Sequence, residues 1–238
     1  NEILLCVTNA YVGYPVISIS RNKIEKGELG EKRFVNVKHI QGWLSKKIED
    51  ENKQAQWRLD PNQSGLANTT ADIGSHVENM VSYLIGKEID SLCARLDTFG
   101  ESRKLEDNST VMINFKDKSK GLLFMSQIAV GENNNFSLSV YGSEATLKWS
   151  FNQANKLTIL REDHKEEIIQ NVEEIPGTNI GFKNTYTTFI TDLIDKKNGK
   201  IITNDNAHFQ SVNAGLRGMR FIEKCVESSK NGCAWVKF

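Results

Sequence analysis

Residues 136–150 read FSLSVY-GSE-ATLKWS, two short runs joined by the turn residues Gly142-Ser143-Glu144. Such runs are typical of β-strands, and the turn between them predicts a hairpin. Five more runs of this kind follow one another between residues 89 and 171: Ile89–Phe99, Ser109–Phe115, Gly121–Val130, Lys156–Arg161 and Glu167–Asn171. Because no helical pattern separates them, we expect consecutive strands to pair antiparallel.

The segments outside this region are mostly helical. Helices are predicted over residues 15–26, 69–86, 182–197 and 207–229, and additional strands over residues 2–7, 33–42 and 233–238. The sequence therefore predicts an α+β fold, a large, predominantly antiparallel β-sheet with helices packed on one face. The other face of such a sheet is half apolar, so we expect a partner to cover it.

The amino-acid composition limits the kinds of binding partner that we expect. Thirty basic residues balance thirty acidic ones among 238, which gives no reason to expect binding to nucleic acid or to a membrane surface. No apolar run approaches the roughly 20 residues that span a bilayer. The four cysteines are scattered without a CxxC pair, which predicts neither a metal site nor a disulfide framework. A reducing cytoplasm is the expected setting.

The segment Thr69–Gly86 is predicted to be one amphipathic helix. Thr69 or Thr70 supplies an N-cap oxygen, and Gly86 can end the helix in a left-handed conformation. An apolar stripe at helical spacing faces the core and comprises Ile73, Val77, Met80, Val81, Leu84 and Ile85.

A polar stripe runs beside the apolar one. Asp72 and His76 lie four residues apart and project from the same side of the first turns. His76 can act as the proton acceptor of a substrate hydroxyl, with Asp72 fixing its tautomer and orientation. The same spacing also suits an aspartate that only partners the helix dipole and a histidine that is only packed. The spacing alone leaves both interpretations open.

Four further residues are candidates for substrate binding. Trp57 can stack on a sugar face, and Arg58 can hydrogen-bond a hydroxyl or carboxylate; the alternatives are a core tryptophan and an Arg58–Asp60 pair. Tyr11 can contact substrate or form the wall of a domain junction. Asn68 can line the site or belong to a loop turn.

Two other groups are interpreted as structural. His39, in the strand predicted over residues 33–42, is taken as solvated or structural. Arg103 is interpreted as forming an ion-pair corner with Glu106 and Asp107.

An ordered set of motifs covers nearly the whole chain. In order they are Tyr14-Pro15, Gly27-Glu28-Leu29-Gly30, Gln41-Gly42-Trp43-Leu44, Trp57-Arg58, Asp72-Ile73-Gly74-Ser75-His76, Arg103-Lys104-Leu105-Glu106-Asp107, Tyr141-Gly142, Gly215–Ile222 and Ala234-Trp235-Val236. In this order the chain resembles the C-terminal, dihydrodipicolinate-reductase-like domain of the Gfo/Idh/MocA oxidoreductases (glucose–fructose oxidoreductase, inositol dehydrogenase and relatives).

The resemblance implies a catalytic role for Asp72 and His76. In this family the histidine of Asp-x-x-x-His exchanges the proton of a substrate hydroxyl while NAD or NADP exchanges a hydride. The full-length protein is thus expected to be an NAD(P)-dependent dehydrogenase or reductase (EC 1.1.1-like) of a sugar, inositol or related polyol. A homodimer or homotetramer through the sheet face is the family expectation.

The chain also departs from the family pattern. It has no GxGxxG phosphate turn and no Glu-Lys-Pro motif. Residues 1–8 are therefore expected to be the remnant of the last strand of an absent dinucleotide-binding domain, and residues 9–238 the substrate-binding and oligomerisation domain. The cofactor-binding residues would belong to the absent domain, so this chain alone is expected to be inactive and to hold no cofactor. The alternative is a non-catalytic oligomerisation or carbohydrate-binding module.

Overall fold

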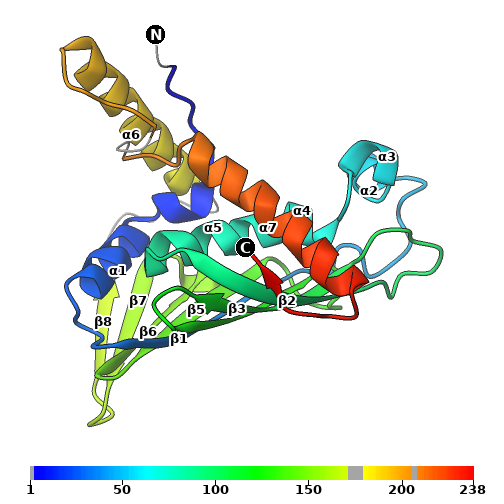
Figure 1. The fold of residues 1–238 in the computed structure, drawn as a ribbon, viewed down its shortest axis with the longest axis horizontal. Coiled ribbons are helices and arrows are strands. Elements are labelled where there is room, and N and C mark those ends of the chain that lie inside the picture. Colours follow the sequence, from blue (N-terminus) through cyan, green and yellow to red (C-terminus); the bar gives the residue numbers. More distant parts are fainter. Residues whose placement is uncertain (1–2, 171–178, 205–207) are drawn as a thin grey trace.

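A computed structural model describes residues 3–170, 179–204 and 208–238. Its strands form a single nine-stranded sheet in the order β8-β7-β6-β5-β1-β4-β3-β2-β9 (Figure 1). The strands are β1 Lys32–Ile40, β2 Ile89–Asp97, β3 Asn108–Phe115, β4 Lys120–Ser126, β5 Asn135–Gly142, β6 Ala145–Ser150, β7 Lys156–Arg161, β8 Glu166–Gln170 and β9 Val236–Lys237. The predicted α+β fold with a large, mainly antiparallel sheet is confirmed.

One strand interrupts the simple up-and-down order. β1 lies between β4 and β5, parallel to the first and antiparallel to the second, with Val37 opposite both Leu123 and Leu138. All other neighbours pair antiparallel, including the β5–β6 hairpin, where Leu138 faces Trp149. The chain therefore crosses from β4 over β1 to reach β5.

The helices lie on one side of the sheet, and the one labelled α6 extends away from it, as Figure 1 shows. They are α1 Pro15–Glu25, α2 Lys53–Arg58, α3 Pro61–Ser64, α4 Thr69–Asp72, α5 Gly74–Ile85, α6 Asn179–Lys197 and α7 Val212–Lys230, with 3-10 turns η1 Ala10–Gly13 and η2 Phe151–Gln153. The apolar stripe of α5, including Val77, Met80 and Leu84, packs on alternate strand residues such as Val111 and Leu123. This continuous apolar core fixes the position of α5 over the middle of the sheet.

The helix predicted over residues 69–86 is two helices. Ile73 separates α4 from α5, and the N-cap of α4 is Asn68 rather than Thr69 or Thr70. Buried Glu106 accepts hydrogen bonds from the backbone N–H groups of Asn68 and Thr70, so a distant carboxylate replaces the expected side-chain cap. Gly86 ends α5 with φ 64°, as predicted.

Other boundaries differ from the sequence-based expectations. Residues 3–7 form no strand: Ile3 is 81% exposed, and the β-pairing of this segment with the described residues is the isolated bridge between Cys6 and Ser211. The helix predicted to start at residue 207 begins at Val212, and residue 207 lies outside the described residues. The strand predicted to end at residue 171 ends at Gln170, and residue 171 is likewise outside them.

Candidate functional site

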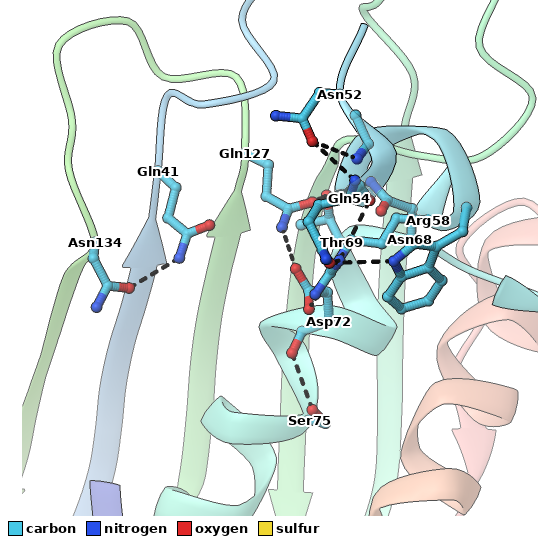
Figure 2. A network of polar contacts seen from close by, with 12 residues as sticks. Gln41, Asn52, Gln54, Arg58, Asn68, Thr69, Asp72, Ser75, Gln127 and Asn134 are labelled. Atoms are coloured by element: carbon cyan, nitrogen blue, oxygen red, sulfur yellow. Dashed lines mark hydrogen bonds and ion pairs between the residues drawn. The ribbon is translucent and has the colours of Figure 1, made fainter. Parts of the chain in front are cut away.

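Asp72 ends α4, and its carboxylate is held by two side chains (Figure 2). Gln127 Nε2 donates a hydrogen bond of 2.7 Å to Oδ2. Arg58 Nε lies 3.2 Å from Oδ1 in an ion pair. Arg58 therefore pairs with Asp72 and not with Asp60, whose carboxylate caps α3 through the Asn62 N–H. The sequence motif Trp57-Arg58 and the Asp-x-x-x-His motif thus meet at one carboxylate.

His76, in the first turn of α5, is oriented by a residue that the sequence did not suggest. Its Nδ1 lies 2.8 Å from Asn9 Oδ1. Because an amide oxygen only accepts, this assignment makes Nδ1 the donor and leaves Nε2 as a proton acceptor. Among the described residues, the hydrogen-bond partner of His76 Nδ1 is Asn9 and not Asp72, so the orienting role expected of Asp72 stays a prediction. The Asp72 carboxylate is instead engaged by Arg58 and Gln127.

The environment of His76 favours the neutral ring. Burial lowers the pKa of His76, and the nearby charge of Asp72 partly opposes that shift. The edge of the Tyr11 ring packs against His76, with ring centroids 5.2 Å apart. A neutral imidazole with a free Nε2 is the form that a general base requires.

Tyr11 lies in η1 and is 7% exposed. Burial raises the pKa of its hydroxyl, while the hydrogen bond with Asn134 acts in the opposite direction. Its ring also contacts His39 and Phe136 edge-on. Tyr11 is therefore a wall residue between His76 and the sheet.

The other predicted binding residues differ in accessibility. Trp57 is 39% exposed and stacks on the Arg58 guanidinium, 4.3 Å from the ring centroid. Asn68 is 1% exposed, and its amide bonds to the Glu106 carbonyl and to Gln127 Oε1. Asn68 thus lies behind Asp72 inside the protein, in a position that does not support the predicted substrate contact.

His39 is a buried member of the same aromatic group. It is 1% exposed, stacks on Phe136 with centroids 4.5 Å apart, and places Nε2 2.7 Å from Asn134 Oδ1. Burial is the main cause that lowers the pKa of His39 to about 4. His39 was expected to be either solvated or structural, and its burial makes it a structural residue.

This buried histidine predicts a pH-dependent stability. The folded-state pKa lies below the unfolded value of about 6.5, so the unfolded chain binds the proton more tightly. The contribution of His39 to stability is present above pH 6.5 and is lost as the pH falls toward 4, a loss of about 3 kcal/mol. Urea unfolding of the wild type and His39→Gln at pH 7 and pH 4 measures it. The variant should lose about 3 kcal/mol less between these pH values. An equal loss in both proteins would contradict the assignment.

Two cavities flank the turn at Ile73. The smaller, about 360 Å³, is lined by Gln41, Gly42, Trp43, Gln54, Arg58, Asp72, Glu132, Asn133 and Asn134. The larger, about 640 Å³, is lined by polar residues that include Asn9, Ser75, His76 and Asn79 and by apolar or small residues such as Leu66, Ala67, Ala71, Ala214, Gly215, Gly218, Met219 and Ile222. Asp72 and His76 therefore open toward different cavities.

Two further classes of site receive no support. In the described part of the chain, no group of three or more His, Cys, Asp or Glu side chains could hold a metal ion. Among the described helices, none has both the length and the apolar composition needed to cross a bilayer.

A comparison with known protein families identifies the family of this chain. The family described as "Oxidoreductase family, C-terminal alpha/beta domain" matches residues 21–238. The chain thus carries an oxidoreductase C-terminal domain, and it belongs to the Gfo/Idh/MocA family.

Individual relatives match nearly the whole chain. The uncharacterized oxidoreductase YfiI of Bacillus subtilis (strain 168) is 27% identical over 253 residues, covering 98% of this chain and 64% of that protein. An inositol dehydrogenase homolog from Azotobacter vinelandii, solved with NAD+, superposes with a TM-score of 0.93 at 25% identity, covering 99% of this chain and 65% of that one. Levoglucosan dehydrogenase, solved with NADH and levoglucosan, shares the fold with a TM-score of 0.81 at 19% identity, covering 97% of this chain and 65% of that one. The chain spans just under two thirds of these relatives.

Proposed function

We propose that this chain is the substrate-binding and catalytic half of an NAD(P)-dependent oxidoreductase acting on a sugar, inositol or related polyol. The observation that carries the proposal is His76, a neutral imidazole whose Nε2 is left free to accept a proton because Nδ1 is engaged by Asn9. Relatives solved with NAD+, with NADH and myo-inositol, and with NADH and levoglucosan support the cofactor and substrate class.

The proton step is assigned to His76. In the oxidation of a secondary alcohol, the hydroxyl proton passes to Nε2 while the carbon gives up a hydride. A bound nicotinamide supplies the hydride acceptor. In the reverse direction protonated His76 returns the proton to the carbonyl oxygen. Asp72, which raises the pKa of His76 by its charge, favours the protonated state that this cycle passes through.

The residues of this chain fit only one end of a dinucleotide. The sequence has no glycine-rich turn that could cradle a pyrophosphate. The apolar cavity beside His76 suits a flat aromatic ring. Ile3 and Leu5 are exposed apolar side chains, at 81% and 49%, which suits packing against another domain. We therefore propose that residues 1–8 belong to a dinucleotide-binding domain and that this chain by itself transfers no hydride.

The outer face of the sheet supports assembly into a homodimer or homotetramer. Exposed apolar side chains on β1, β3 and β4 form a patch on that face, comprising Phe34, Met112, Leu122 and Phe124. A protein that light scattering finds only as a monomer would contradict this assembly. The free thiols of all four cysteines agree with a reducing, cytoplasmic setting.

Turnover by the full reading frame tests the function. The gene product is expressed from its own start codon and assayed with myo-inositol, levoglucosan and glucose, each with NAD and with NADP. We expect reduced nicotinamide to accumulate with at least one polyol. Absence of turnover with every pair, despite binding of a polyol, would favour the carbohydrate-binding module instead.

A further inference from the structure

A residue that no sequence motif indicated joins the N-terminal segment to α5. Gln210 directly precedes Ser211, the N-cap of α7. Its backbone carbonyl accepts a hydrogen bond of 2.7 Å from the Val7 N–H, and its side-chain Oε1 accepts one of 2.9 Å from Asn79 Nδ2. Gln210 therefore holds together two segments that carry the groups around His76.

The N-terminal segment leads from this contact to the imidazole. The Val7 carbonyl accepts from the Asn9 N–H at 2.9 Å, which closes a three-residue turn in front of Asn9. Asn9 occupies the N-cap of η1, where an asparagine side chain commonly binds the first free N–H groups of a helix. Here it makes no capping bond, and its Oδ1 lies 2.8 Å from His76 Nδ1 instead. The Asn9 side chain is thus committed to the histidine.

The α5 helix supplies the other side of the connection. Asn79 follows His76 by three residues and is 2% exposed, so the two side chains leave α5 at neighbouring points of its surface. Asn79 Nδ2 binds Gln210, while Oδ1 has no partner among the described residues. The bond to Gln210 is therefore what anchors this buried amide within the described part of the chain.

Together these contacts form a closed circuit of hydrogen bonds. The circuit runs from the His76 ring through Asn9, Val7 and Gln210 to Asn79 and returns along α5. In such a network each bond restrains the others, so the loss of one member loosens the rest. Asn9 can move away from the imidazole more easily once the bond between Gln210 and α5 is broken.

Gln210 itself lies outside the site. It lines neither of the cavities that flank Ile73, whereas Asn9, His76 and Asn79 all line the larger one. A ligand or ring bound in these cavities would therefore not touch Gln210. An effect of Gln210 on turnover has to pass through the residues that it holds in place.

We infer that Gln210 is a positioning residue for the proton step: by tying α5 to the N-terminal segment it keeps Asn9 against His76 Nδ1. The inference rests on the proposed function, because it concerns the group to which the proton step is assigned. When the tie is lost and Asn9 moves away, the ring also samples the tautomer that carries its proton on Nε2. That tautomer has no free Nε2 lone pair with which to accept a proton.

The tautomer of His76 in the 238-residue chain is the first test. Gln210→Met keeps an unbranched side chain and removes the acceptor for Asn79, whereas Gln210→Glu keeps an acceptor. NMR of the ¹⁵N-histidine-labelled chain at about pH 8, where imidazole is neutral, reads the protonated nitrogen of each ring. We expect the Nδ1–H form of His76 in the wild type and in Gln210→Glu, and a mixture of both forms in Gln210→Met. An unchanged tautomer in Gln210→Met would overturn the inference.

The kinetics of the full-length protein are the second test. Gln210→Met should lower kcat for the best polyol about tenfold and change KM less than about twofold, because it misplaces the proton acceptor and leaves the ligand contacts intact. Gln170→Met, the same change at an exposed glutamine of β8, should leave both constants unchanged. A higher KM with an unchanged kcat would contradict a positioning role in the proton step.

A double variant shows which contact transmits the effect. Asn9→Ala removes the direct partner of His76 and should lower kcat at least as much as Gln210→Met. Adding Gln210→Met to Asn9→Ala should lower kcat less than about twofold further, since no Asn9 contact is left to maintain. Effects that multiply would mean that Gln210 acts independently of Asn9, and would also overturn the inference.

The outcomes distinguish this inference from the proposed function. If the full-length protein oxidises polyols and Gln210→Met keeps the wild-type kcat, the positioning role is wrong and the function stands. If the tautomer of His76 depends on Gln210 but the full-length protein reduces no nicotinamide, the function is wrong and the positioning role stands.

Discussion

Replacing His76 by alanine is expected to lower kcat of the full-length protein for its best polyol by about 100- to 10,000-fold. The physical reason is that Nε2 of His76 is the proton acceptor left free by the Asn9 contact, and alanine removes it without changing the charge of the neutral site. Initial rates over a range of polyol concentrations give kcat and KM separately. The fall is expected mainly in kcat, because a proton acceptor acts in the chemical step rather than in holding the ligand.

A second histidine provides the control. His164 is exposed in the β7–β8 turn with φ 58°, and His164→Asn keeps a residue that tolerates this backbone. That variant should retain wild-type kinetics. Wild-type turnover in His76→Ala would exclude His76 as the acid/base group, whatever the behaviour of His164→Asn.

The sheet was largely predictable because each strand carries its own local pattern. The β5–β6 hairpin is specified by turn residues between two short runs, and the register places Leu138 opposite Trp149 as such a hairpin requires. The position of β1 was not predictable, because the sequence of residues 32–40 contains no local signal that β1 pairs with β4 and β5. Long-range pairing depends on how buried faces of distant segments fit.

The site was predictable only where one helix carries it. The spacing of Asp72 and His76 follows from helix geometry, so the motif placed both residues close together. Asn9, Gln127 and Asn134 come from three separate segments and hold Asp72, His76 and Tyr11 in place. Isolated amides in loops have no periodic signal. Among the amides near the site, the sequence singled out Gln41, as part of the motif Gln41-Gly42-Trp43-Leu44. No role was assigned to it there.

The break at Ile73 alters the interpretation of this helix. Ile73 itself keeps a right-handed helical backbone, with φ −100° and ψ −24°, so the two helices stay nearly continuous there. With the turn, Asp72 lines the polar cavity and His76 the apolar one. The Tyr11 ring packs against His76 beside this segment.

Replacing Arg103 by alanine is expected to lower the free energy of unfolding by about 3–5 kcal/mol, because it breaks a buried ion pair and leaves the partner charge alone. The Arg103 side chain is 5% exposed and that of Asp107 is fully buried. Arg103 donates to Glu49 at 2.6 Å and to Asp107 at 3.3 Å. The predicted ion-pair corner thus exists with Glu49 in place of Glu106. Urea unfolding at pH 7 measures the loss.

A control variant and a binding measurement show whether the effect of Arg103→Ala is specific. Arg95→Ala removes an arginine that is mostly exposed beside Asp97, so it should change stability little. The Asp107 carbonyl accepts from the Gln127 N–H at 3.0 Å, and Gln127 in turn holds Asp72. Arg103→Ala should therefore also weaken polyol binding below its unfolding transition, whereas Arg95→Ala should not. Unchanged stability in Arg103→Ala would mean that the corner is solvated and does not support the Asp72 wall.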